Sequence, residues 1–387
     1  MNKHSAPCLR FAGFAGEWEE KKLEDFSPLQ RGFDLPVSKI VEGDYPVVFS
    51  NGILKTHNQY KVKGVGVVTG RSGTIGEVTF VEKDFWPHNT ALWVTNFFDN
   101  DPQFVFQFLK NFDLSRFATG SGVPTLNRND VHDQIVYAPK REEQTALGDF
   151  FRRLDETLAQ ARARLAKTQQ LKRAMLAKLF PQHGETAPKL RFKGFSGDWE
   201  RKMLGENASF TKGRGYSKSD LTNEGFPIIL YGRLYTQYEN IINNVDTFVS
   251  YDQNALKSFG NEVIVPASGE TAEDIARASA VIQKGVILGG DLNVITPNND
   301  ISPPFLAVAL TNGKSSKELA KKAQGKSVVH LRNDDLKACE IYFPPTFEEQ
   351  TTIGNFFQKL DQTLALQTAE LEKLTALKKA LLAAMLV

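Results

Sequence analysis

The sequence contains only two cysteines, Cys8 and Cys339, among its 387 residues. Two cysteines are too few for a disulfide framework, and free thiols in a reducing compartment are the simpler interpretation. There is no run of 18 apolar residues, no secretory leader and no lipidation motif, so we expect no membrane segment or anchor. These absences favour a soluble, cytoplasmic protein over a secreted or membrane-bound one.

Catalytic and metal-binding motifs are also scarce. The six histidines and two cysteines show none of the spacings typical of zinc sites, and no Walker A sequence is present. One short match remains, because Ser302-Pro303-Pro304-Phe305 is similar to the catalytic tetrapeptide of amino-methyltransferases. A serine N-cap followed by proline in the first helical turn explains these residues without chemistry. We therefore expect no active site and no metal in this chain.

The charge balance is nearly neutral, with a formal net charge of +2 and a pI of about 8.3. This is weak support for nucleic-acid binding, but the distribution of the charges is more informative. Against only Asp155 and Glu156, the stretch 152–178 carries eight basic residues: Arg152, Arg153, Arg162, Arg164, Lys167, Lys172, Arg173 and Lys178. They form either a solvated helix face or a basic flank that faces a polyanion or an acidic partner.

The chain repeats itself. Leu9–Glu19 (LRFAGFAGEWE) matches Leu190–Glu200 (LRFKGFSGDWE) at an offset of 181 positions. By Pro139, whose counterpart is Pro345, the offset has grown to 206, so insertions lie inside the second copy. The opening segments agree closely while the interiors barely agree. A duplicated scaffold whose globular parts have diverged suggests that one architecture reads two different ligands or sequences.

Each copy ends in a stretch typical of a long helix. From Leu147 and from Ile353 onward, apolar or small residues recur in steps of three and four, which indicates one narrow seam. A seam sustained over several heptads predicts coiled-coil pairing of helices about 55 Å long. The residues expected to pair are Phe151, Leu154, Leu158, Leu165, Leu171, Phe357, Leu360, Leu364, Leu371 and Leu377.

The length favours two to three units. We expect a globular part at 1–142, a long helix at 143–180, a Pro-flanked connector at 181–189, a second globular part at 190–348 and a second long helix at 349–387. If the helices pair antiparallel, the globular parts lie at opposite ends, related by a pseudo-twofold axis. Successive major-groove sites on one face of DNA are about 34 Å apart, so the helices would act as a ruler on that scale.

Short runs of Val, Ile, Phe and Thr between Gly, Asn and Asp predict strands in both globular parts. In the first part they are 46–49, 66–68, 77–81, 91–94 and 134–137, with a helix at 102–112. In the second part they are 228–230, 262–265, 275–281, 292–295 and 339–343, with a helix that follows Pro303–Pro304. Short strands mixed with one or two helices indicate the α+β class.

A Gly-rich loop at 69–76 links two of these strands. It carries Arg71, Ser72 and Thr74, donors suited to phosphates or guanine edges, although an ordinary hairpin turn is the alternative. The repeat places Ser268, Glu270 and Thr271 in the equivalent loop, where Glu270 can accept from a cytosine amine. Both halves keep a Ser-Gly loop while its charged residue changes, which favours recognition over a simple turn.

Further polar loops add candidates for DNA contact. The loops at 118–125 and 323–327 are either phosphate-binding or connectors, and the loop at 211–216 is either a nucleic-acid contact or a surface loop. With Asn89, these candidates are Ser121, Thr125, Lys212, Arg214, Tyr216, Lys326 and Ser327.

The repeated LRFxGFxGxWE segments, the globular parts that end in Pro and Glu-Glu-Gln, and the two long helices together resemble the specificity subunit of type I restriction–modification systems. The resemblance spans essentially the whole chain. It implies two target recognition domains, each reading one half of a bipartite site in double-stranded DNA, held apart by two long antiparallel coiled-coil helices. Because recognition domains vary almost freely in that family, the candidate residues carry over only as loop positions.

The resemblance also implies partners and cofactors. The helices would dock two modification subunits, which carry S-adenosylmethionine-dependent methylation of adenine N6, and restriction subunits would add ATP-driven translocation and cleavage. S-adenosylmethionine, ATP and Mg²⁺ are therefore expected in the partner subunits, with no cofactor in this chain. Two alternatives remain: a self-contained DNA adenine methyltransferase that uses Ser302–Phe305, and a coiled-coil assembly scaffold without DNA contact, against which the diverged polar loops argue.

Overall fold

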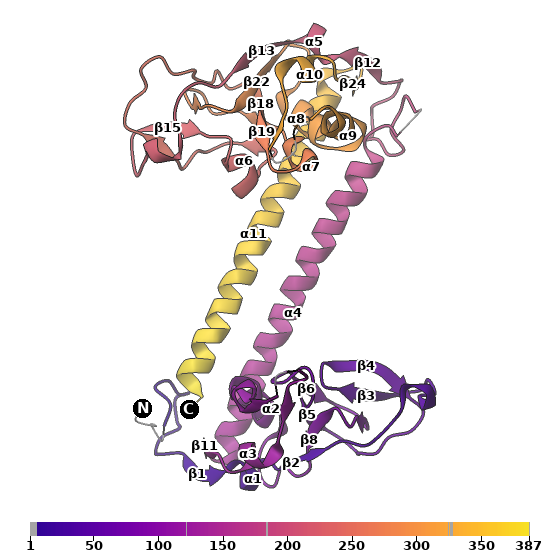
Figure 1. Cartoon of the computed structure of the whole chain (residues 1–387), viewed down its shortest axis with the longest axis vertical. Helices are drawn as coiled ribbons and strands as arrows, with labels where there is room; N and C mark the ends of the chain where they lie inside the picture. Colours follow the sequence, from indigo (N-terminus) through magenta and orange to yellow (C-terminus); the bar gives the residue numbers. More distant parts are fainter. Residues whose placement is uncertain (1–5, 121, 183–184, 324, 326–327, 387) are drawn as a thin grey trace. The chain divides into compact units, whose positions relative to one another are not determined.

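The structure is a computed structural model that describes residues 6–120, 122–182, 185–323, 325 and 328–386. Contacts divide the chain into a first unit, Met1–Arg162 with Glu370–Val387, and a second unit, Ala163–Ala369. Each long helix is thus shared between the two units, while each unit has its own sheets and core (Figure 1). No helix in the described ranges is long and apolar enough to cross a membrane.

The first unit is built on a four-stranded antiparallel sheet in the order β2-β8-β5-β6. Its central strand β5 is buried at all five residues, as expected of a Val-rich run between glycines. A smaller sheet in the order β4-β3-β7 lies at its edge. The bounds are β2 Leu29–Arg31, β8 Ala91–Val94, β5 Gly66–Gly70, β6 Val78–Val81, β4 Gly52–His57, β3 Tyr45–Phe49 and β7 Trp86–Pro87.

Helix α2 (Pro102–Asn111) packs on β5 and β6 of this sheet. Asp101 caps it, accepting from the backbone amides of Gln103 and Phe104 at 3.0 and 3.1 Å, and Pro102 occupies the first turn. Phe104 is fully buried and meets Trp18 edge to face at 6.2 Å. The tryptophan of the repeated opening segment is therefore a core residue.

The second unit repeats this plan. Its main sheet has the order β13-β22-β18-β20-β16, and α8 (Pro303–Thr311) packs on β18 and β20 as α2 packs on β5 and β6. Phe305 takes the place of Phe104 and meets Trp199 at 5.7 Å. The bounds are β13 Ala208–Lys212, β22 Leu292–Pro297, β18 Glu262–Pro266, β20 Ser279–Val281, β16 Ile241–Ile242, β15 Phe226–Ile229, β17 Phe248–Val249, β14 Leu221–Thr222 and β21 Ile287–Leu288.

Smaller elements complete both units. A two-stranded ribbon joins each opening segment to the strand before the long helix, β1 with β11 and β12 with β24. The remaining bounds are β1 Glu19–Lys22, α1 Leu23–Phe26, η1 Val37–Lys39, η2 Leu114–Phe117, β9 Ala118–Thr119, β10 Thr125–Leu126, α3 Arg128–His132, β11 Ile135–Ala138, β12 Glu200–Met203, α5 Leu204–Asn207, η3 Lys218–Asp220, α6 Arg233–Thr236, β19 Ser268–Gly269, α7 Ala272–Ile275, α9 Gly313–Lys322, β23 Val329–His330, α10 Asn333–Lys337 and β24 Glu340–Phe343.

The hydrogen-bond register aligns the two interiors that barely agree in sequence. Gly32 donates its N–H to Ala91 at 3.0 Å, and Gly213 donates to Leu292 at 2.9 Å. A Cβ at Gly32 would lie 2.2 Å from the carbonyl oxygen of His88, and a Cβ at Gly213 would lie 1.8 Å from a carbonyl oxygen in the same relative place. The offset of 181 thus continues into the sheets, and both units share one fold.

The long helices are α4 (Arg141–Lys178) and α11 (Phe347–Met385). In the first unit the start of α4 packs with the end of α11, and in the second unit the end of α4 packs with the start of α11. The expected α+β class, the internal repeat and the two long antiparallel helices are therefore confirmed.

The Glu-Glu-Gln motif connects each long helix to its own unit. The side chain of Gln144 accepts from the backbone N–H of Asp101 at 2.9 Å, and Gln350 accepts from Ser302 at the same distance. Gln144 also donates to the carbonyl oxygen of Pro139 at 2.8 Å. Both glutamines are buried, so the motif fixes the angle at which the long helix leaves the core.

The burial pattern departs from the predicted helix seam in one region. Phe151, Leu158, Phe357 and Leu360 are buried, and Leu154, Leu165, Leu364 and Leu371 are half-buried. Leu171 and Leu377 are instead 41% and 49% exposed. The predicted seam assumes a strict heptad repeat. A straight α-helix drifts by about 20° per heptad relative to that repeat. This drift turns Lys172 and Lys378, which follow Leu171 and Leu377, inward.

Several element boundaries differ from the sequence-based expectations. Residues 275–281 do not form one strand, because Ile275 ends α7 and β20 begins at Ser279. Helix α4 ends at Lys178, since Leu179 and Phe180 turn into the second unit's core, where Phe180 stacks on Phe305 at 5.7 Å. The charged strand β1 was not expected, because its formation depends on the distant partner β11.

Candidate nucleic-acid interface

Arg71 follows β5 directly and its backbone is held from both sides. Its N–H donates to the carbonyl oxygen of Thr90 at 2.9 Å, and its own carbonyl accepts from Leu126 at 2.8 Å. A Cβ on the preceding Gly70 would lie 1.7 Å from the carbonyl oxygen of Thr74, so this turn needs glycine. The half-buried Arg71 side chain has no hydrogen bond or ion pair within the described part of the chain.

Two loops that were predicted separately lie side by side. Ser72 forms a β-bridge with Thr125, and Gly73 donates its N–H to the carbonyl oxygen of Pro124 at 2.9 Å. Thr74 is exposed at the tip of its loop. The candidate Ser121 falls outside the described residues.

A hollow of about 580 Å³ opens next to this junction, and we call it the arginine hollow. The candidate Asn89 is not part of its lining and donates to Asp34 instead. Three arginines from separate elements line the hollow together with Thr125: Arg31, Arg71 and Arg128.

Of these three arginines, only Arg71 was among the candidates selected from the sequence. The pattern Asn127 to Asp130 is a helix-start signal, which would have placed Arg128 in a first turn but not at the hollow. The hydrogen-bond register, and not the sequence, brings the three arginines together.

In the second unit, Ala267 occupies the place of Arg71. Its N–H donates to Asp291 at 2.7 Å and its carbonyl accepts from Leu331 at 3.0 Å, which repeats the pattern around Arg71. The charged residue of the first loop is therefore replaced by alanine. Glu270, expected as its counterpart, is exposed and stands three residues further on, as Thr74 does after Arg71.

Two other candidates in this loop have structural hydrogen bonds. Ser268 is buried and its hydroxyl donates to Asp291 at 3.0 Å. Thr271 caps α7 by accepting from the backbone N–H of Asp274 at 3.0 Å. Lys326 and Ser327 lie outside the described residues, and they stay predictions.

The loop after β13 presents basic side chains. Lys212 ends β13 at the register position of Arg31, and Lys212 and Arg214 are both exposed. Tyr216 has a positive φ of 56° and donates its hydroxyl to the carbonyl oxygen of Tyr251 at 3.2 Å. The loop therefore offers two cations next to a tyrosine pair whose ring centres are 5.1 Å apart.

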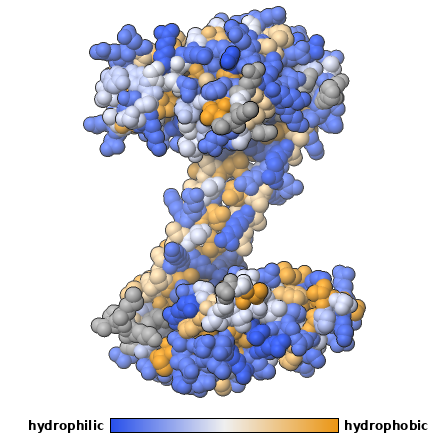
Figure 2. Space-filling model, viewed as in Figure 1, coloured by the Kyte–Doolittle hydropathy of each residue, from blue (hydrophilic) through white to orange (hydrophobic). Residues whose placement is uncertain are grey.

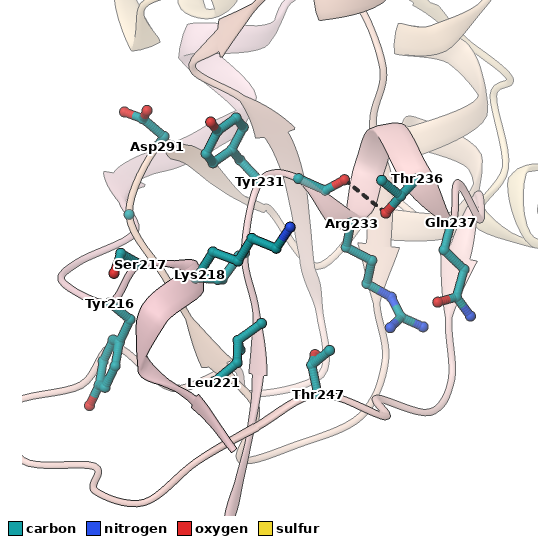
Figure 3. Close-up of a pocket in the computed structure, with 13 residues that line it drawn as sticks. Tyr216, Ser217, Lys218, Leu221, Tyr231, Arg233, Thr236, Gln237, Thr247 and Asp291 are labelled. Carbon is teal, nitrogen blue, oxygen red and sulfur yellow. Dashed lines mark hydrogen bonds between the residues drawn. The ribbon is translucent and has the colours of Figure 1, made fainter. Parts of the chain in front are cut away.

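Beside Tyr216 the second unit has a cavity of about 590 Å³ that the sequence did not reveal (Figure 3). The side chain of Lys218 extends into it (Figure 3) and has no hydrogen bond or ion pair with any described residue. Arg233 is almost buried in the wall and pairs with Glu239 at 3.0 Å and with Asp246. The hydrogen bond from Arg233 lowers the pKa of the exposed Asp246.

Gly290 lines this cavity, and Gly289 precedes it. Gly289 takes the place of His88, because each donates its N–H at 2.9 Å to the strand that runs parallel to its own. In the first unit the His88 ring packs on Phe49 at 4.4 Å, and burial lowers the pKa of His88. In the second unit the side chain of Leu230, which lines the cavity, takes that space, since a Cβ at Gly289 would lie 2.5 Å from it.

Comparison with known proteins decides the family. The sequence model of the type I restriction modification DNA specificity domain matches residues 15–170 and 196–376, which is most of the chain. This chain belongs to that family. Its two units correspond to the two copies of the DNA specificity domain, so the predicted family is confirmed.

The chain is also similar to solved structures. The S subunit of a type I restriction–modification system from M. genitalium is 18% identical, with 99% of each chain covered and a TM-score of 0.71. A chain from a study of complex assembly and conformational transition in a type I R-M system is 16% identical, with 94% and 96% covered and a TM-score of 0.49. The HsdS subunit from Thermoanaerobacter tengcongensis is 16% identical, with 94% and 95% covered and a TM-score of 0.42. No curated protein matches the chain.

The tetrapeptide Ser302–Phe305 belongs to the core of this specificity subunit. Phe305 is fully buried between Trp199, Phe180 and Phe343, so it is not available to stack on a substrate base. Ser302 stands at the predicted N-cap of α8 with Pro303 in the first turn, but its side chain makes no capping bond, and Gln350 accepts from its backbone N–H instead. The methyltransferase alternative thus loses its candidate residues. Within the described ranges, no group of three or more His, Cys, Asp or Glu residues could hold a metal.

Proposed function

We propose that this chain is the DNA-reading, non-catalytic subunit of a type I restriction–modification complex, with one unit for each half of a bipartite site. The arginine hollow is the observation that supports this best. In a family of DNA specificity domains, unpaired guanidinium groups beside a threonine hydroxyl offer donors for both phosphates and base edges. The visible face of the molecule is also mostly hydrophilic (Figure 2).

The second unit reads the other half-site with different residues. Lys212 and Arg214 supply positive charge from one loop, and the exposed Glu270 accepts from a base amine. Because the second unit has alanine at the place of Arg71, the two half-sites differ in sequence. Different half-site sequences are expected when the two copies of a duplicated fold carry different DNA-contacting residues.

The long helices set the distance between the half-sites and dock two modification subunits, which methylate adenine N6 with S-adenosylmethionine. Restriction subunits, with ATP and Mg²⁺, complete the nuclease. On α4 the basic side chains of Arg162, Lys167 and Arg173 are exposed, and they offer a charged flank to such partners.

Methylome sequencing tests the proposal directly. A host that expresses this chain with its cognate modification subunit should gain a bipartite motif with methyladenine in both halves. The same host with the modification subunit alone is the control and should show no such motif. A genome without any new motif in the first strain would overturn the proposed function.

A further inference from the structure

Two of the three guanidinium groups in the arginine hollow, those of Arg71 and Arg128, have no hydrogen bond or ion pair with any residue that the structure describes. Arg31, in contrast, is held by Asp34 at 3.0 Å. The hollow therefore presents ten unused N–H donors, five from each free guanidinium, and one neutralised ion pair.

Both free arginines stand on fixed backbone. Arg71 is clamped between Thr90 and Leu126 by the hydrogen bonds described above. Arg128 is the first residue of α3, where Asn127 accepts from the backbone N–H of Asn129 at 3.2 Å. A side chain on a fixed backbone loses less freedom on binding and holds its geometry, as a specific contact requires.

Two of the side-chain acceptors that line the hollow are already engaged by described residues, and the amide of Gln30 is not. The side-chain oxygen of Asn127 is taken by the α3 cap, and the Asp34 carboxylate accepts from both Arg31 and Asn89. Cytosine and adenine expose an amine in the major groove and need an acceptor from the protein. Guanine exposes two acceptors, O6 and N7, which match the fork of an arginine.

If the chain reads DNA as proposed above, we infer that the first unit recognises a guanine in its half-site through Arg71. The half-buried Arg71 pairs with guanine O6 and N7, and the exposed Arg128 contacts a neighbouring phosphate. Thr125 lines the same hollow.

The second unit lacks this device. Ala267 has no donor in its side chain, and Asn333, at the place of Arg128, uses its side-chain amide to donate to the carbonyl oxygen of Thr211 at 3.0 Å. A guanine in the second half-site is therefore not read by these two positions. Part of the sequence difference between the two half-sites therefore depends on the residues at these two positions.

The test uses the full chain bound to its modification subunits and a duplex that carries its methylation motif. An iron chelate attached through Thr74→Cys, at the exposed loop tip, cleaves the DNA near the first unit and assigns its half-site. Each guanine of that half is then replaced by 7-deazaguanine, which removes the N7 acceptor and keeps Watson–Crick pairing. One replacement should weaken binding about five- to tenfold, as expected for loss of one bond of a bidentate pair.

Variants of the chain separate base reading from structure. Arg71→Ala should weaken specific binding about 5- to 150-fold and abolish the sensitivity to 7-deazaguanine. Arg71→Lys keeps the charge without the fork, so it should retain binding to random DNA and lose the guanine preference. Arg128→Ala should weaken binding to all sequences alike and lower the salt slope by about one.

Other outcomes would overturn the assignment. A first half-site without guanine, or an Arg71→Lys complex that keeps its sensitivity to 7-deazaguanine, excludes Arg71 as the guanine reader. Either result leaves the bipartite motif in place, so the proposed function would survive. Loss of the motif itself in the wild-type strain is the separate failure of the proposed function.

Discussion

Lys378 of α11 forms an ion pair with Asp155 of α4 inside the first unit, where the lysine side chain is only 10% exposed. Asp155 also accepts from Gln107 of α2 at 2.8 Å, so one carboxylate joins both long helices to the recognition domain. The second unit repeats the arrangement at an offset of 206, with Lys172 paired to Asp361. A buried ion pair is typical of a device that selects one register of two helices.

Removing one member of this pair should destabilise the first unit. Lys378→Met leaves Asp155 with the hydrogen bond from the neutral Gln107 and the charge of Lys110, and we expect a loss of about 2 kcal/mol in the free energy of unfolding. The double variant Asp155→Leu with Lys378→Met should recover most of that loss, because no uncompensated charge remains. Urea unfolding of the single and double variants gives the coupling energy. A coupling below about 0.5 kcal/mol would show that the pair does not select the register.

The same carboxylate predicts an acid dependence of stability. Burial raises the pKa of Asp155, but the hydrogen bonds from Lys378 and Gln107 outweigh it, so the pKa lies below its ordinary value. Folding therefore favours the ionised form, and this stabilisation is complete above the unfolded pKa of about 3.9. The stabilisation is lost as the pH falls through the lower pKa that Asp155 has in the folded state. Unfolding measured from pH 6 to pH 3 should show a flatter profile in Asp155→Asn than in the wild type, and parallel profiles would contradict the assignment.

The opening segments are held by a second buried pair. Arg10 donates from two nitrogens to Glu143, at 2.8 and 2.5 Å, and the Glu143 side chain is only 4% exposed. Glu143→Gln removes the charge from a fork-shaped pair, and we expect it to cost about 3 kcal/mol. Glu142→Gln, at the exposed neighbour, should change the unfolding free energy by less than about 0.5 kcal/mol. Equal effects of the two variants in thermal unfolding would refute a role for the buried pair.

The two helix leucines that the sequence treated alike should behave differently. Leu158 is 5% exposed and Leu171 is 41% exposed. Leu158→Ser should destabilise the protein by about 3 kcal/mol, because it removes buried apolar volume and buries a hydroxyl. Leu171→Ser should cost less than about 1 kcal/mol. Chemical denaturation of both variants compares them, and a larger effect at Leu171 would restore the strict heptad seam.

The repeat and the long helices were predictable because their signals are local. A tryptophan that recurs as Trp18 and Trp199, or an apolar residue every three or four positions, can be seen without knowing any distant contact. The strand positions followed for the same reason. The residues that pair the helices were predictable only where the strict heptad repeat and the true helix period agree, as at Leu158. The prediction failed at Leu171, where the repeat and the helix period have drifted apart.

The arginine hollow was only half predictable. Arg71 could be selected because a Gly-rich loop with a cation is a local pattern. Its partnership with Arg128 depends on contacts between residues more than fifty positions apart, among them the hydrogen bond from the N–H of Leu126 to the carbonyl oxygen of Arg71. The same hydrogen-bond pattern in the second unit makes Ala267, and not Glu270, the residue equivalent to Arg71. No pattern within either loop encodes that alignment.

The core of the first unit includes Met385 and Leu386, which pack with residues as early as Trp18 and Phe26. A ribosome adds about 5–20 residues per second, so the part of this unit made first waits roughly 10–45 s for the two residues that close its core. During that interval the nascent chain must tolerate an open apolar site, while the second unit, whose core needs only Leu179 onward, can close earlier. Loss of Met385 and Leu386 would thus damage the unit whose core also contains Trp18 and Phe26.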